Sequence, residues 1–366
     1  MKKIAIDCRC FVSMNGVSRY LENILDNLFV KDIENKYFLI APKNYKVLEK
    51  YKKYDNVTVA NFNVFSDIVY KFFLIRKFIQ KNNINIYWSP TQDNLLFKID
   101  NCITIITIHD IAFEHYKNWF GFKVQILSYL GLYKRFFLNS NFVFYISKFT
   151  KSDAEKTYGI AKDNIITYNG ASEVFKEINK DVAREYVSKK FHFNKKFIFY
   201  IDTVRYENLF NAFKLFLKEN DDVDLVCLGS FAGNNILNYA RNIEIENNIK
   251  WINYRVSDLD LNNLYSAAEF FISPSYYEGF GLTPLESIQS GTPIVVSNLT
   301  SLPEIFEGSA LFFNPDDIRD IHDQMKLLIN NDPLKKDLLN KSKHLIDKYD
   351  WKNISNNILK VFNNIY

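Results

Sequence analysis

Short apolar runs rich in Val, Ile, Phe and Tyr recur along the whole chain and alternate with helical segments. Most of these runs are continuously apolar, which is typical of strands buried on both faces of a parallel sheet. The runs of the first half span residues 4–11, 37–42, 57–62, 84–90, 103–110, 142–147 and 164–170. Those of the second half span residues 196–202, 223–229, 248–254, 268–275, 292–298 and 309–315. This alternation predicts an α/β fold with doubly wound parallel sheets.

The chain has 366 residues, more than a single hydrophobic core usually supports. A polar stretch at 171–195 separates the two sets of expected strands and is the best candidate for a linker. We therefore expect two domains, at residues 1–175 and 190–350. An amphipathic segment at 351–366 follows the last expected strand and could belong to either domain.

Charge is divided unevenly between the two halves. Residues 1–175 hold 24 Lys and Arg against 16 Asp and Glu, a net charge of +8, whereas the remainder has a net charge of −4. A basic first half suits anionic lipid, an anionic substrate or nucleic acid, although ordinary variation among solvated charges also accounts for it. The positive charge is modest and the Phe and Tyr excess lies in the core strands, so we expect no nucleic-acid partner.

Several classes of protein are excluded by simpler features. The chain has no run of eighteen uncharged apolar residues, so we expect no membrane-spanning helix. Its first residues read as a strand and then meet charge, which is unlike a signal peptide. The four cysteines lie in apolar runs without metal-ligand spacing, and we expect reduced core thiols in a cytoplasmic protein. No cluster of His, Cys or acidic residues suggests a metal, so no metal and no cofactor is expected.

Polar residues and glycines gather where the expected strands end. In open α/β sheets, ligands bind in the crevice beyond the carboxyl ends of the strands. Two such edges in two domains predict an enzyme that binds two molecules in a cleft between the domains. The strand-end positions are Asn15, Gly16, Ser89, His109, Asp110, Ser147, Asn169, Gly170, Arg205, Gly229, Ser230 and Glu278.

The most specific segment spans residues 273–298. Gly279 and Gly281 permit a tight turn and the close approach of a ligand to the backbone. We expect Thr283 to cap the following helix, with Pro284 at its first position and Glu286 completing a capping box. Gly291 and then Pro293 should end that helix. Its N-terminus, with free amides and a positive dipole end, suits a phosphate.

Two carboxylates, Glu278 and Glu286, bracket this turn. Either could have a purely structural role, Glu286 as part of the capping box and Glu278 as a solvated loop residue. A phosphate bound at this turn would repel both carboxylates. They are therefore better suited to accept hydrogen bonds from hydroxyl groups. A sugar nucleotide carries both phosphates and hydroxyls.

The segment EGFGLTPLE (278–286) resembles the E-x7-E motif of retaining glycosyltransferases of family 4, which have the GT-B fold of two facing Rossmann-like domains. Further segments occur in the order and spacing of that family. They are NGVSRYLENIL (15–25), TIHD (107–110), YISKFTKSD (145–153), TYNG (167–170), DLDLNNLYSAAEFFISPS (258–275) and LTSLPEIFEGSALFFNPDD (299–317). The motif set is most similar to that of mannosyl- and rhamnosyl-transferring members in bacterial surface polysaccharide synthesis, such as lipopolysaccharide, O-antigen or capsule.

The resemblance implies a role for each matching residue. Glu278 would lie beside the hydroxyls of the donor sugar, and Glu286 would hold the nucleotide ribose. His109 would contact the transferred sugar near the reacting carbon, although a histidine satisfied at a strand end is the simpler alternative. In this family the terminal helix packs back on the first domain, which would place 351–366 there. The diphosphate would meet the backbone amides of Gly281, Leu282 and Thr283, with Gly279 and Phe280 beside them and Asn15 and Gly16 approaching from the other domain.

One position departs from the family pattern. The family has an Arg and a Lys in the loop after the first strand of the second domain, and both neutralise the departing diphosphate. Arg205 can fill the Arg role, but Glu207 stands where the Lys is expected. This leaves a catalytically silent partner protein on the same fold as an alternative to a hexosyltransferase acting on a glycan or lipid-linked acceptor. A nucleotide-sugar 2-epimerase, which shares the two-domain architecture, is a second alternative.

Two basic, apolar segments of the first half suggest peripheral attachment to the inner face of the plasma membrane. Segment 66–81 places Tyr70, Phe73, Leu74 and Phe78 at helical spacing among Lys and Arg residues. Segment 123–138 has a similar character and ends in two basic residues followed by Phe136 and Phe137. The simpler alternative is that both are ordinary helices packed on the first sheet.

Overall fold

A computed structural model describes residues 1–12, 16–63, 70–92, 98–201, 206–229 and 235–365. The chain divides into two compact units. Unit 1 comprises Met1–Gly170 with Asp350–Tyr366, and unit 2 comprises Ala171–Tyr349.

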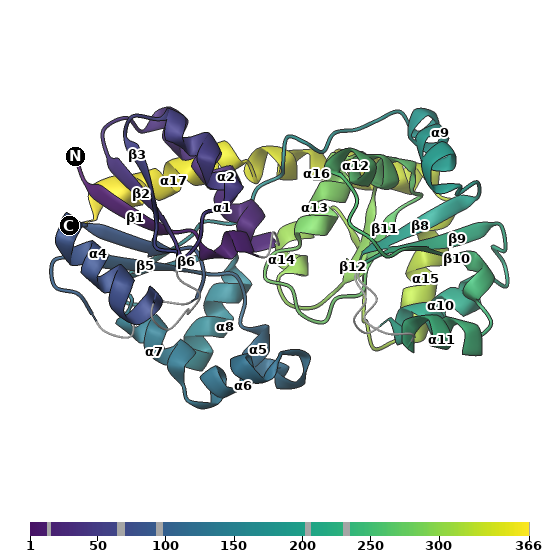
Figure 1. Cartoon of the computed structure of the whole chain (residues 1–366). Coiled ribbons are helices and arrows are strands. Elements are labelled where there is room, and N and C mark those ends of the chain that lie inside the picture. Colours follow the sequence, from purple (N-terminus) through teal and green to yellow (C-terminus); the bar gives the residue numbers. More distant parts are fainter. Residues whose placement is uncertain (13–15, 64–69, 93–97, 202–205, 230–234, 366) are drawn as a thin grey trace. The chain divides into compact units, whose positions relative to one another are not determined.

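Unit 1 is built on a parallel sheet of seven strands in the order β3-β2-β1-β4-β5-β6-β7 (Figure 1). Helices lie in most of the connections between consecutive strands, as is usual for crossovers between parallel strands, whereas the described residues between β4 and β5 form no helix. The strands are β1 (Lys3–Asp7), β2 (Lys36–Ala41), β3 (Val57–Asn61), β4 (Ile86–Ser89), β5 (Ile103–Ile108), β6 (Phe142–Tyr145) and β7 (Asn164–Ile166). The α-helices are α1 (Gly16–Lys31), α2 (Lys46–Glu49), α4 (Ile75–Asn82), α5 (Ala112–His115), α6 (Phe122–Tyr129), α7 (Leu132–Asn139), α8 (Lys148–Tyr158) and α17 (Trp351–Asn364).

Unit 2 repeats the architecture with six parallel strands in the order β10-β9-β8-β11-β12-β13. The strands are β8 (Lys196–Ile201), β9 (Val223–Leu228), β10 (Ile249–Ile252), β11 (Phe271–Ser273), β12 (Ile294–Ser297) and β13 (Leu311–Phe313). The α-helices are α9 (Lys180–Phe191), α10 (Glu207–Phe216), α11 (Asn235–Asn242), α12 (Asp258–Ala267), α13 (Leu282–Gln289), α14 (Leu302–Phe306), α15 (Ile318–Ile329) and α16 (Asp332–Lys348).

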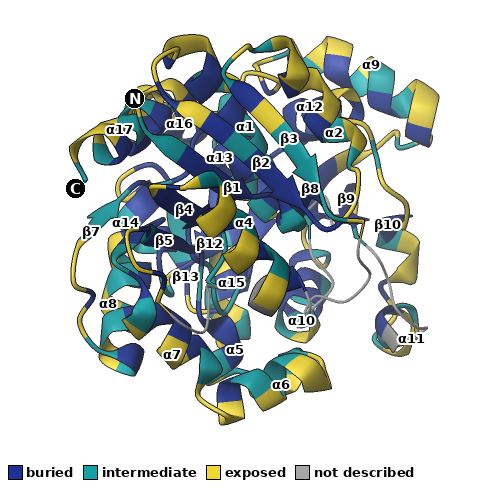
Figure 2. Cartoon of the chain, turned by 60° about the vertical axis from the view of Figure 1, so that its left-hand side comes forward, coloured by how far each residue is buried: buried dark blue, intermediate teal, exposed yellow. Residues whose placement is uncertain are grey.

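The expected strands and the α/β class with two Rossmann-like parallel sheets are confirmed. Every apolar run named above overlaps one of the strands, although β1 and β2 each begin one residue before their runs. Most strands are shorter than their runs because the sequence pattern continues into the flanking turns. Most strand residues are buried, with the edge strands β3 and β7 partly exposed, while the outer faces of the helices are exposed (Figure 2). The cleft between the two domains stays a prediction.

The stretch expected as a linker is not wholly irregular. It contains α9, whose Ala183, Val187 and Phe191 are buried and which packs against α12 within unit 2. Its polar composition reflects a helix with one narrow buried face. In the structure the first part of unit 1 ends at Gly170 and unit 2 ends at Tyr349. The sequence predicts domains at 1–175 and 190–350.

The C-terminal helix α17 belongs to unit 1 and packs on α1. Phe362 contacts the Trp88 ring of β4, with 5.7 Å between the ring centroids, and Trp351 contacts the Tyr20 ring of α1 at 5.8 Å. The amino group of Lys2 donates to the backbone oxygen of Phe362 at 2.9 Å. The last helix of the chain therefore completes the core of the first unit.

We expect Gly170→Ala to destabilise unit 1 by about 1–3 kcal/mol, because a Cβ there has no room. It would lie 2.7 Å from the Trp351 ring and 2.8 Å from the Trp351 backbone nitrogen, which cannot move aside. Chemical denaturation measures the loss. Gly121→Ala is the matched control, since a Cβ at Gly121 meets nothing within 4 Å. Equal stability of the two variants would contradict the packing described here.

Candidate active site

In unit 2 the segment after β11 runs along the carboxyl edge of the sheet and leads into α13. Residues 274–281 form the loop, and Gly281 adopts a left-handed conformation with φ +97° immediately before the helix. A Cβ on Gly281 would lie 2.8 Å from Leu302 Cδ2 and 3.0 Å from Phe306 Cε2 of α14. The position therefore requires glycine both for its backbone conformation and for the close approach of α14.

The expected cap of α13 is wrong. The helix begins at Leu282, with Gly281 in the cap position and no side-chain cap, so Thr283 and Pro284 already lie within the first turn. The left-handed Gly281 starts the helix earlier than the pattern of Thr, Pro and Glu indicates. Gly291 ends the helix as predicted, with φ +80° and its N–H donating to the Ile288 oxygen.

Because the helix starts early, Glu286 lies one turn inside it and cannot complete a capping box. Its side chain is buried, only 5% exposed. The hydroxyl of Tyr265, a fully buried residue of α12, donates to Glu286 Oε2 at 3.2 Å. A buried carboxylate is costly unless it is well hydrogen-bonded. The position of Glu286 is thus better suited to ligand binding than to helix capping.

Glu278 lies in the loop and is half-buried. The Ser275 hydroxyl donates to Glu278 Oε1 at 2.9 Å. The Glu278 backbone is held by the loop after β12, since its N–H donates to Thr300 Oγ1 at 3.1 Å and its oxygen accepts from the Ser301 hydroxyl at 2.8 Å. Two loops at the same edge of the sheet therefore fix the position of this carboxylate.

The first turn of α13 offers backbone amides at the same edge. Helix geometry leaves the first N–H groups without an intrahelical acceptor, and here these belong to Leu282 and Thr283, since Pro284 has no N–H. Phe280 is buried and its ring packs edge-on against Tyr349 at 5.1 Å. Its side chain is therefore part of the core, which leaves only its backbone available to a ligand.

The candidate site residue of unit 1 is His109, which follows β5 and is buried. Its Nε2 lies 2.9 Å from the Pro90 carbonyl oxygen, which can only accept, so Nε2 carries the proton. Burial lowers the pKa of His109 to about 4. The ring is therefore neutral at pH 7, with Nδ1 as its hydrogen-bond acceptor.

The Tyr20 ring of α1 packs edge-on against His109, with 4.8 Å between the ring centroids. Gly16, exposed at the start of the same helix, lies one turn before Tyr20. Packing between α1 and the end of β5 thus brings the expected Gly16 segment and His109 to the same region of unit 1. Asn15 and Arg205 lie outside the residues that the structure describes. Glu207 is exposed at the first position of α10.

Sequence reasoning missed the residues that support these side chains. Tyr265 and Tyr20 appear in the sequence as ordinary core aromatics, and only tertiary packing shows their polar or ring contacts. Ser275 had a local signal, because it stands three residues before Glu278 in the same loop.

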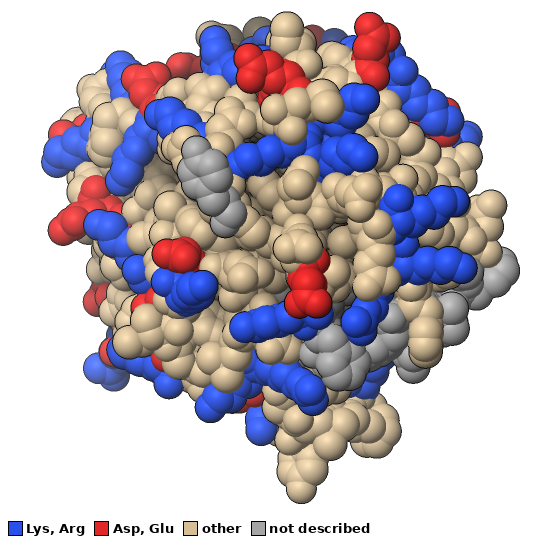
Figure 3. All heavy atoms as spheres, turned by 90° about the vertical axis from the view of Figure 1, so that its left-hand side faces the viewer, with Lys and Arg blue, Asp and Glu red and all other residues tan. Residues whose placement is uncertain are grey.

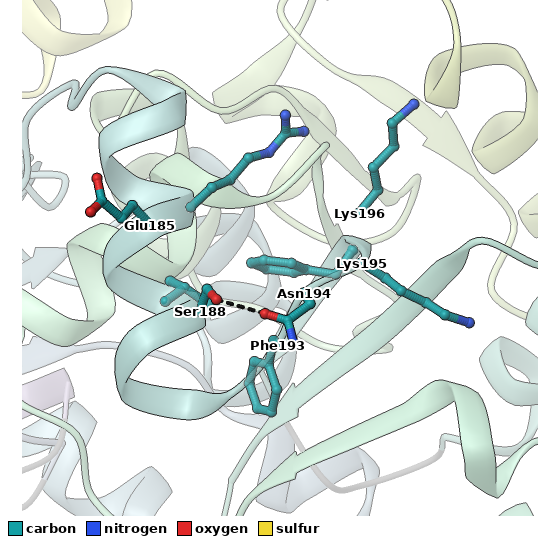
Figure 4. A pocket seen from close by; sticks show the side chains of 9 residues that line it. Glu185, Ser188, Phe193, Asn194, Lys195 and Lys196 are labelled. Carbon is teal, nitrogen blue, oxygen red and sulfur yellow. Dashed lines mark hydrogen bonds between the residues drawn. The ribbon is translucent and has the colours of Figure 1, made fainter.

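A pocket of about 300 Å³ in unit 2 lies elsewhere, between α9 and the beginning of β8 (Figure 4). The Ser188 hydroxyl donates to Asn194 Oδ1 at 2.6 Å across it, while Glu185 and Lys195 extend to opposite sides. It lies at the amino end of β8, away from the edge at which α/β sheets bind ligands. The pocket is therefore not the candidate site.

The described residues contain neither a metal-binding group nor a helix that could span a membrane. Within the described ranges, no group of three or more His, Cys, Asp and Glu side chains could hold a metal ion. The helices that are described there are all too short or too polar to cross a membrane. The four cysteines are free and buried.

We expect acid to destabilise the protein through His109. Its folded-state pKa of about 4 lies below the ordinary value of 6.5, so on acidification the unfolded chain takes up a proton that the folded chain does not. This single group should lower the free energy of unfolding by about 2 kcal/mol between pH 7 and pH 5. Denaturation at both pH values checks it, with His109→Gln as the comparison. The stability of the variant should fall less over that interval; an identical fall would show that His109 takes up its proton equally well in the folded state.

The sequence is similar to those of known glycosyltransferases. Residues 184–345 match the family described as Glycosyl transferases group 1. The serotype-specific mannosyltransferase WbdA of Escherichia coli is 24% identical over 341 residues, which cover 88% of this chain and 40% of WbdA. The O-antigen chain mannosyltransferase RfbU of Salmonella typhimurium is 26% identical over 251 residues, which cover 68% of this chain and 66% of RfbU. The chain thus matches less than two thirds of the length of either relative.

The fold has solved counterparts. HepE of Anabaena, solved in complex with UDP-glucose, superposes with a TM-score of 0.78 at 14% identity and full coverage of both chains. Sucrose-phosphate synthase from Thermosynechococcus elongatus gives a TM-score of 0.76 at 13% identity, covering 100% of this chain and 99% of that protein. Such low identity establishes the fold alone. Residues 184–345 form a glycosyl transferases group 1 domain, within a chain that has the two Rossmann-like units of the GT-B fold.

Proposed function

We propose that this protein is a retaining glycosyltransferase of the family 4 type. It transfers a hexose from a nucleotide-diphosphate sugar to a glycan or lipid-linked acceptor in bacterial surface polysaccharide synthesis, such as lipopolysaccharide, O-antigen or capsule. The observation that carries the proposal is the pair of anchored carboxylates, Glu278 and buried Glu286, on either side of the Gly281 turn.

The donor is assigned from the chemistry of that edge. The amides of Leu282 and Thr283, at the positive end of the α13 dipole, suit the diphosphate. Glu286 accepts hydrogen bonds, which suits the ribose hydroxyls, and Glu278 suits hydroxyls of the sugar. The Gly281 turn lets the phosphate reach the backbone. Gly279 and the Phe280 backbone complete this loop beside the donor.

His109 is proposed to contact the transferred sugar. Its neutral ring, protonated at Nε2, presents Nδ1 as an acceptor for a sugar hydroxyl. A neutral ring at this position does not repel the positive charge that develops at the reacting carbon. We propose that Asn15 and Gly16 contact the diphosphate and that Arg205 stabilises the departing nucleotide diphosphate.

The relatives support transfer over the alternatives. WbdA and RfbU carry the names of mannosyltransferases, and HepE was solved with UDP-glucose. These names favour a transferase over a 2-epimerase or a catalytically silent partner protein. They also favour mannose as the hexose and an O-antigen chain as the product. The exposed position of Glu207 lets its carboxylate turn away from a bound diphosphate, so the missing Lys does not exclude catalysis.

We expect Glu286→Ala to weaken donor binding and Glu278→Ala mainly to lower turnover. Each loses hydrogen bonds to a charged group, about 1.5–3 kcal/mol, which corresponds to roughly 10- to 150-fold. Calorimetric titration with the nucleotide-diphosphate sugar that the native protein binds most tightly, and an assay of released nucleotide diphosphate in the presence of acceptor, separate the two effects. Tyr265→Phe should weaken donor binding by a smaller factor, because the carboxylate remains but loses one donor that positions it.

Glu246→Ala is the control for these variants, since this exposed carboxylate lies at the amino end of β10. Unchanged binding and turnover in both site variants would remove the site assignment. A lower melting temperature of Glu286→Ala with full activity per folded molecule would show that this carboxylate has only a structural role. Donor binding by the native protein without turnover would favour the silent partner protein.

We propose that transfer needs no metal ion, with the α13 dipole and Arg205 stabilising the diphosphate instead. Turnover should therefore persist in excess EDTA, measured as nucleotide diphosphate released per minute. The control is a metal-dependent sugar transferase treated in parallel. Loss of activity in EDTA that manganese or magnesium restores would contradict this part of the proposal.

A further inference from the structure

Helix α6 of unit 1 carries an apolar face that points to solvent. Phe122, Ile126, Tyr129 and Leu130 are 77%, 39%, 86% and 62% exposed. Their spacing of four, seven and eight residues places them on one side of the helix and its C-cap. Contiguous exposed apolar side chains on a folded protein commonly mark an interaction surface. We name these four residues the α6 face.

The opposite side of α6 is anchored to unit 1. Val124 and Leu127 pack against the apolar cluster that contains Phe113, Tyr133 and Phe137. The Ser128 hydroxyl donates to Glu114 Oε2, and Gln125 Nε2 donates to the Phe120 oxygen at 2.7 Å. The α6 face is therefore held outward by a well-packed helix.

The chain segment that carries the α6 face is basic. No Asp or Glu stands between Glu114 and Asp153, and Glu114 is half-buried where it accepts from Ser128 and from the Tyr158 hydroxyl. Basic side chains are exposed on both sides of α6. They are Lys117, Lys123, Lys134 and Arg135. Lys and Arg also outnumber Asp and Glu on the side of the molecule that Figure 3 shows.

Two aromatic residues precede the helix. The Tyr116 and Trp119 rings stack with 3.9 Å between their centroids, and both residues are half-buried. Tyr and Trp are favoured at the level of lipid headgroups, where one end of the ring is apolar and the other is hydrated. An apolar face, flanking basic residues and interfacial aromatics are the features of a segment that lies in a membrane surface.

The structure changes which residues could meet a membrane. Phe136 and Phe137, expected from the sequence as part of such a surface, are buried. In the segment around α4, Tyr70 is buried and Phe78 packs against the rings of Phe38 and Phe62. Phe73 of the same segment is 68% exposed, so the described part of that segment is only partly in the core. A contiguous set of exposed apolar residues lies on α6, which falls almost wholly within the expected segment 123–138 but precedes its Phe136 and Phe137.

We propose that the α6 face inserts into the surface of an anionic lipid bilayer. The neighbouring Lys and Arg side chains then contact the anionic lipid headgroups. Charge complementarity selects this occupant: basic residues near an anionic membrane attract it, and the apolar side chains supply the remaining affinity. Binding requires no sugar transfer, so this inference stands apart from the proposed function.

The test uses the full chain and vesicles of phosphatidylglycerol with phosphatidylcholine, compared with vesicles of phosphatidylcholine alone. We expect co-sedimentation with the anionic vesicles at low salt, less at high salt, and little with the neutral ones. Trp119 fluorescence should shift to shorter wavelength on binding, and Trp119→Phe should remove the shift. The double variant Phe122→Ser with Tyr129→Ser should lower the partition coefficient about a hundredfold.

Val30→Ser with Ile33→Ser is the matched control, because these apolar residues of unit 1 are 67% and 81% exposed away from the α6 face. It should bind vesicles like the native protein. Melting temperatures verify that each variant is folded. Absence of binding to anionic vesicles at low salt would overturn the proposal, as would equal binding by the α6 and control variants. Self-association that the α6 variant abolishes, without vesicle binding, would assign the face to a second copy of the chain instead.

Discussion

Parallel strand pairing is the constraint from which the arrangement of this protein follows. Every strand pair in both sheets is parallel, so each connection must return across a face of the sheet and each strand delivers its next loop to the same edge. In unit 2 this geometry brings the loops after β11 and β12 together, and Ser301 and Thr300 of one loop hold Glu278 of the other. In unit 1 it brings the end of β5, with His109, next to the beginning of α1. Within each unit, candidate site residues are thereby brought next to segments that are distant in the sequence.

The start of α13 shows how one residue decides the chemistry of that edge. Gly281 allows a left-handed turn against Leu302 and Phe306, so the helix begins at Leu282 and carries Glu286 into the interior. Removing a carboxylate from water is unfavourable, and the hydrogen bond from the Tyr265 hydroxyl offsets part of that cost. The proposed donor would bring further hydroxyls to the same carboxylate.

Local patterns were sufficient for the fold and insufficient for the details of the site. Continuous apolar runs predicted the strands because burial on both faces leaves a direct trace in the sequence. Gly291 was predicted correctly because a left-handed helix end needs glycine. Thr283 was expected to cap α13, and this was wrong because the close packing of α14 on Gly281 moves the start of the helix. The linker prediction missed α9 because a helix with a narrow buried face is mostly polar. Phe136 and Phe137 looked like surface anchors, but only the tertiary structure shows that they are buried while Phe122 and Tyr129 are exposed.

The other proposed roles depend on unit 2 binding a nucleotide-sugar donor by its diphosphate and its hydroxyls together. Calorimetric titration of the full chain with a panel of nucleotide-diphosphate sugars, each compared with its free nucleoside and its free sugar, tests this most directly. We expect at least one member of the panel to bind with one-to-one stoichiometry and far more tightly than either fragment alone. If no member of the panel bound, or if a free nucleoside bound as tightly as the intact donor, unit 2 would not be the proposed donor site.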